Sequence, residues 1–151
     1  MNSANLHAEN SARAVYFYEF SYVGQLSAQH NFVDQIRGAS HRDQTSYIID
    51  FYKWTGNYSD LDTRDRLTTM WTDFVKFEDP TAFESSLISL KWQKYSKGEK
   101  KYLSIDNDLK IKSDPLPNGF EFWKKIYEKN YWHPTPLTPE NINKINKNKK
   151  K

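Results

Sequence analysis

Cysteine is absent from the 151 residues. This absence excludes disulfide bonds, thiolate catalysis and thiolate metal sites. No segment approaches the roughly 20 consecutive apolar residues that a helix needs to cross a bilayer, so no membrane span is predicted. The first ten residues are polar and lack the apolar core of a secretory signal peptide. We therefore expect the chain, as it stands, to be cytoplasmic.

Acidic residues are missing from the end of the chain, where the positive charge is concentrated. The formal net charge is +3, and taking away the five Lys of residues 141–151 leaves −2 for residues 1–140. Residues 134–151 are rich in Pro and then in Asn and Lys, so we predict a disordered tail. Such a tail can bind nucleic acid, but it has no aromatic residue for base stacking. We favour a solvated tail and expect no nucleic-acid partner.

Aromatic residues, by contrast, are plentiful, and several alternate along one predicted strand. The chain holds ten Tyr, nine Phe and five Trp. In residues 14–22 they occupy both faces of a period-two pattern, which is typical of a strand that is covered on both sides in the middle of an α/β sheet. Residues 90–95 and 101–105 are predicted to be two further extended segments, joined by a turn at residues 97–99.

Three helices are predicted from apolar residues that recur at helical spacing. They cover about residues 43–53, about residues 63–77, and a last segment that Asn118 caps, with Glu121 reaching back to it. Aromatic residues on one face of the second and third of these helices are consistent with either a ligand-binding site or packing in the hydrophobic core. We interpret this aromatic stripe as core; its members are Trp71, Phe74 and Tyr127.

Five segments, in order along residues 13–130, resemble the type-B carboxylesterases, the family that includes the cholinesterases and the insect esterases. The style of the matches is closest to the insect esterases. The matching segments are residues 15–20 (VYFYEF), 38–43 (GASHRD) with 47–48 (YI), 70–76 (MWTDFVK) with 79–80 (DP), 90–95 (LKWQKY), and 102–105 (YLSI) with 122–123 (FW).

The resemblance implies an α/β-hydrolase fold and ester hydrolysis by a Ser-His-Glu/Asp triad. In such a triad the histidine takes the proton of the serine, and the acid orients the imidazole. His41 matches the triad histidine. The implied fold class is α/β, a partial α/β-hydrolase fold with the C-terminal strands and helices of the sheet only. The implied domain covers residues 13–133, between a disordered N-terminus at residues 1–12 and the tail.

The sequence departs from the family in three places. Its glycines stand at positions 24, 38, 56, 98 and 119, and no two are four residues apart, so the G-x-S-x-G elbow of the nucleophile is absent. The triad acid lies upstream in the family and is also missing. Gln44 stands where relatives have an acid three residues after the histidine. Residues 76–80 (KFEDP) lack the family's glycine, which removes the easy left-handed stop for the preceding helix.

Several functions follow from this pattern. The first is the C-terminal segment of a serine carboxylic ester hydrolase that is inactive alone and acts on an ester once the missing part completes it. The second is a non-catalytic, esterase-like binding remnant. A third, nucleic-acid binding through the tail, ranks last. Neither a cofactor nor a metal is expected, because His7, His30 and His133 show no ligand spacing. The oligomeric state and secretion of a longer product stay open. A pseudo-triad of His41, Ser46 and Asp43 is not expected to form.

Overall fold

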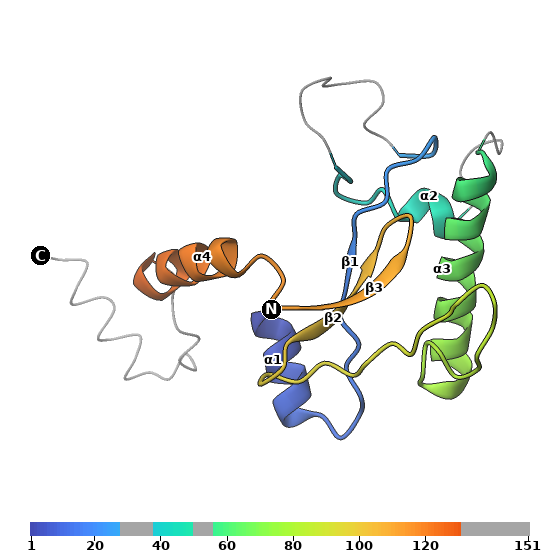
Figure 1. Cartoon of the computed structure of the whole chain (residues 1–151). Coiled ribbons are helices and arrows are strands. Elements are labelled where there is room, and N and C mark those ends of the chain that lie inside the picture. The colour runs from blue at the N-terminus through green and yellow to red at the C-terminus, as the bar shows by residue number, and fades with distance from the viewer. Residues whose placement is uncertain (28–37, 50–55, 131–151) are drawn as a thin grey trace, which may run out of the picture. The chain divides into compact units, whose positions relative to one another are not determined.

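The computed structural model describes residues 1–27, 38–49 and 56–130 (Figure 1). The chain divides into two compact units, Met1–Pro115 and Leu116–Lys151. The first unit holds three helices and three strands: α1 (Asn2–Asn10), β1 (Tyr18–Phe20), α2 (Thr45–Ile48), α3 (Tyr58–Phe77), β2 (Lys101–Ile105) and β3 (Leu109–Ser113). The second unit holds α4 (Pro117–Asn130).

The three strands form one mixed sheet in the order β1-β2-β3. Strand β1 is parallel to β2, with Tyr18 opposite Leu103, and β2 is antiparallel to β3, with Leu103 opposite Ile111. Beyond both ends of β1 the chain makes further backbone hydrogen bonds, to residue 95 before the strand and to the end of β2 after it. The Val15 carbonyl accepts from the Tyr95 amide at 2.7 Å, and the Ile105 carbonyl accepts from the Tyr22 amide at 3.1 Å. The predicted strand is therefore shorter than expected but correctly placed.

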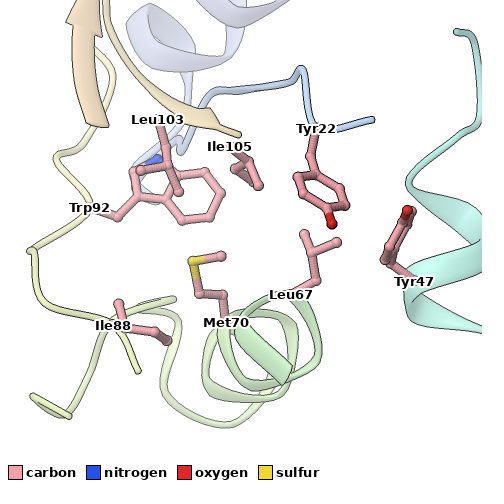
Figure 2. Packing of buried hydrophobic residues seen from close by; sticks show 8 residues of the cluster. All are labelled: Tyr22, Tyr47, Leu67, Met70, Ile88, Trp92, Leu103 and Ile105. Atoms are coloured by element: carbon pink, nitrogen blue, oxygen red, sulfur yellow. The ribbon is translucent and has the colours of Figure 1, made fainter. Parts of the chain in front are cut away.

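The hydrophobic core lies between the sheet and α3. Figure 2 shows Leu67 and Met70 of α3 facing Leu103 and Ile105 of β2, with Trp92 beside them. Tyr22 and Tyr47 close one end of this cluster. All of these side chains are at least 94% buried, so the helix is held to the sheet mainly by apolar contact.

Helix α3 begins at a side-chain cap and ends at a residue in the left-handed conformation. Asn57 caps it, because its side chain accepts from the Asp60 amide while the Asp60 carboxylate accepts from the Asn57 amide. This reciprocal pair is a capping box. The predicted start at residue 63 is therefore five residues late. At the other end, Glu78 takes the left-handed conformation (φ 58°) that glycine adopts most easily.

Two predictions about the strands are wrong. Residues 90–95 form no strand, and the antiparallel partner of β2 is β3, which the sequence analysis missed. The turn at residues 97–99 is present but joins no hairpin. Within the described residues β1 is an edge strand, and its side chains are half-buried.

The terminal segments also differ from expectation. Residues predicted to be disordered at the N-terminus form α1, which the Tyr95 hydroxyl contacts through Asn5 Oδ1 at 2.7 Å. Such a contact comes from residues 90 positions away, so local composition does not reveal it. In the second unit α4 begins at Pro117, a favoured first position, and Asn118 is inside the helix instead of capping it. The predicted tail lies outside the described residues.

Candidate active-site segment

His41 lies in a turn immediately before α2, and its side chain is exposed. The turn is held from both sides of the histidine. The Asp43 amide donates to the Ser40 carbonyl at 3.2 Å, and the Thr45 amide donates to the Arg42 carbonyl at 2.9 Å. Helix α2 is shorter than predicted, since it ends at Ile48. Residues 50–53 of the predicted helix lie outside the described part of the chain.

Asp43 stabilises this turn instead of completing a triad. Its carboxylate is 1% exposed and accepts from both the amide and the hydroxyl of Ser40, at 2.7 and 2.6 Å. The Ser40 hydroxyl is thereby engaged with a carboxylate. Among the described residues, no hydrogen bond joins His41 to Ser40 or Ser46. These local hydrogen bonds fix the backbone of the turn on which His41 stands.

The carboxylate of Asp60, in the first turn of α3, is buried and contacts α2 through Tyr47. Sequence reasoning did not identify it. Oδ1 of Asp60 accepts from the hydroxyls of Tyr22 and Tyr47, both at 3.1 Å, and from the Gln25 amide at 3.2 Å. Burial, together with the hydrogen bond and the negative charge of Asp60, raises the pKa of Tyr22 to about 12. Burial is also the main reason that the pKa of Tyr47 is raised. We call these four residues the Asp60 cluster.

An open apolar pocket of about 200 Å³ lies on another part of the first unit. It is lined by residues of β1 and the segment before it, of α3 and of the connection between α3 and β2: Tyr16, Tyr18, Met70, Trp71, Phe74, Val75, Pro80 and Trp92. The rings of Tyr18 and Trp71 meet edge to face, 5.1 Å between centroids. The stripe on α3 was predicted to be core. Trp71 is partly buried, but Phe74 is 45% exposed and forms a wall of the pocket.

The remaining histidines and the predicted core tyrosine lie outside the turn that carries His41. His7 lies in α1, whereas His30 and His133 are outside the described residues. Tyr127 lies in α4 of the second unit and is 48% exposed. In the described ranges, no group of three or more His, Asp or Glu side chains is arranged to hold a metal ion. No helix of these ranges is long and apolar enough to cross a membrane.

The mixed sheet and the helix packed against it match an α/β-hydrolase esterase. The crystal structure of juvenile hormone esterase from Manduca sexta superposes with a TM-score of 0.67 at 19% sequence identity, over 84% of this chain. The chain therefore has part of an α/β-hydrolase fold. The sequence model of the carboxylesterase family matches residues 1–123. This protein belongs to the carboxylesterase family.

Curated relatives agree with this assignment. Neuroligin-2 of Homo sapiens and neuroligin-2 of Rattus norvegicus are each 25% identical to the chain in an alignment 143 residues long that covers 82% of the chain. The chain spans only 16% of the length of these relatives and 25% of the Manduca esterase. The family and the fold predicted from the five motifs are thus confirmed, and the role of His41 stays a prediction.

Proposed function

We propose that this chain is the histidine-bearing segment of a serine carboxylic ester hydrolase. The observation that carries the proposal is the position of His41 in the family motif, within residues that the family model matches. In ester hydrolysis the imidazole removes the proton of the serine hydroxyl as that oxygen attacks the carbonyl carbon. It then returns a proton to the departing alcohol.

The position of His41 suits a base whose nucleophile comes from elsewhere. Its side chain is exposed, while the Ser40–Asp43 hydrogen bonds hold its backbone. A base must come within about 2.6–3.2 Å of the hydroxyl that it deprotonates. An exposed imidazole on a fixed turn can meet that condition when a serine elbow is placed against it.

The substrate and partner belong to this proposal too. The substrate class is a carboxylic ester, and the partner is the remainder of an α/β-hydrolase domain, which supplies the serine and the acid. Two features support such a partner. β1 is an edge of the three-stranded sheet in the described residues, so its outer backbone groups can pair with another strand. The apolar pocket opens beside it, lined by Tyr16 and Tyr18.

The alternative is a non-catalytic, esterase-like binding module. Gln44 favours it, because relatives have an acid at this position, and the apolar pocket could serve any partner. The likeness to insect esterases also remains a prediction, since 19% identity to the Manduca esterase establishes the fold alone.

Hydrolysis of p-nitrophenyl butyrate by the purified chain and by its His41→Ala variant tests the division of the triad. We expect both proteins to release nitrophenolate at the same background rate, because the chain holds no serine elbow. Turnover that disappears in the variant would contradict the proposal. It would mean that a nucleophile lies inside these 151 residues, and Ser40→Ala and Ser46→Ala would then identify it.

A further inference from the structure

Residues that precede His41 and a residue that follows it all donate hydrogen bonds to one side chain, Asp60. Tyr22 and Gln25 lie where the chain leaves β1, and Tyr47 lies in α2, six residues after His41. Their donors meet on Oδ1 of Asp60, in the first turn of α3. The two tyrosine rings stand edge to face with centroids 5.5 Å apart, and Figure 2 shows both at the same end of the core.

We propose that Asp60 is the positioning residue of His41. It holds Tyr22 and Gln25, which precede His41, and Tyr47, which follows it, against α3. Among the described residues the hydrogen-bond partners of Asp60 do not include His41, so Asp60 acts only through the backbone of the turn. The effect on catalysis rests on the proposed function of His41. The attachment of the turn to α3 is a property of this chain alone.

The chemistry of the Asp60 cluster fits a fixed attachment. Asp60 is fully buried, and its two oxygens accept from four donors, the fourth being the Asn57 amide at 2.9 Å on Oδ2. A buried carboxylate is stable only when donors replace its lost water. Hydrogen bonds to a charged group are also the stronger kind. Releasing either tyrosine therefore leaves a buried charge less satisfied, which opposes movement of the segment.

The close approach of the chain at Gly24 is a second sign of this attachment. A Cβ atom at this position would stand 1.8 Å from Asp60 Oδ1 and 2.5 Å from the Tyr47 hydroxyl. Both distances are far inside van der Waals contact, so the backbone reaches the carboxylate only because residue 24 has no side chain. The start of the segment is thus packed directly on the group that also binds its end.

Tyr47→Phe in the full chain, with Tyr95→Phe as the matched control, tests the proposal. Each variant removes one hydroxyl of a buried tyrosine, but the Tyr95 hydroxyl contacts Asn5, away from the Asp60 cluster. The first readout is hydrogen exchange of the amides whose bonds form the turn and α2: Asp43, Thr45, Tyr47 and Ile49. The second is the NMR spectrum of the His41 imidazole, assigned with His41→Ala.

We expect Tyr47→Phe to speed exchange of these four amides about five- to tenfold, the equivalent of one net hydrogen bond. It should also move or broaden the His41 imidazole signals. Tyr95→Phe should leave both readouts as in the parent chain. Exchange rates and imidazole signals that are the same in the two variants would overturn the proposal.

Tyr22→Phe provides an independent variant if Tyr47→Phe does not fold, since it releases the other end. It should speed exchange of the Tyr22 and Ser27 amides, which donate to Ile105 and Gly24, and disturb the same imidazole signals. Unchanged His41 signals in this variant would likewise overturn the proposal. Neither readout uses ester hydrolysis, so failure of the proposed function would appear separately, in the activity assays.

Discussion

Tyr22 shows at the scale of one residue how the Asp60 cluster depends on protonation. Its hydroxyl is buried against a carboxylate, so the neutral form is strongly preferred in the folded protein, and its pKa is raised to about 12 from 10.0. In the unfolded chain the same hydroxyl ionises near the ordinary value. The contribution of this group to stability is therefore complete below about pH 10 and is lost as the pH rises toward 12.

Urea unfolding at pH 8 and at pH 11.5 should reveal this dependence. We expect Tyr22→Phe to remove roughly 2 kcal/mol of the fall in unfolding free energy between the two pH values. Tyr58→Phe is the control, because Tyr58 is 88% exposed, and it should keep the fall of the parent chain. Equal falls in all three proteins would show that Tyr22 does not titrate as described.

The two important residues of the site differ in how well the sequence reveals them. His41 was found through a local motif of six residues, and the family match agrees with that motif. Asp60, by contrast, was not predicted as a site residue. Its partners Tyr22 and Tyr47 lie 38 and 13 residues away, and no local pattern of charge or hydrophobicity encodes a contact at such separation.

At the scale of elements, α3 was the most predictable part and also contains an unusual stop. Its apolar stripe predicted the end at Phe77 correctly. The next residue, Glu78, must adopt φ 58° without being glycine, and its amide donates to the Phe74 carbonyl at 2.9 Å. A left-handed conformation costs a non-glycine residue about 1–2 kcal/mol.

Comparison of Glu78→Gly with Glu78→Ala isolates that strain. Both variants lose the exposed ion pair with Arg13, but only glycine relieves the left-handed backbone. We expect Glu78→Gly to be more stable than Glu78→Ala by about 1 kcal/mol in urea unfolding. An alanine variant as stable as the glycine variant would contradict the assignment of strain to this position.

The strands were less predictable than α3, because short strands carry little sequence signal. β3 was not predicted, although Leu109 and Ile111 alternate with Lys110 and Lys112 after an Asp-Asn-Asp turn, a pattern that is typical of a strand. Residues 90–95 have a similar apolar content. There the Trp92 indole donates to the Phe17 carbonyl at 3.2 Å and the Tyr95 amide donates to the Val15 carbonyl, but the segment does not become a strand.

At the scale of the whole molecule, the chain belongs to the carboxylesterase family but holds only part of the family fold. The chain has a buried core of its own, yet it spans a quarter of the Manduca esterase that it resembles. Its apolar pocket and the outer edge of β1 are the surfaces at which the proposed serine-bearing part would join it. The central claim is therefore a division of one triad between this chain and upstream residues.

The measurement that tests this claim most directly begins with the complete transcript. The polypeptide translated from it is assayed with p-nitrophenyl butyrate, alongside the same polypeptide with alanine in place of His41. We predict a G-x-S-x-G elbow upstream of Met1 and a loss of activity of at least about 1,000-fold in the variant. A transcript without that elbow, or equal activity of the two polypeptides, would contradict the account and favour the binding module.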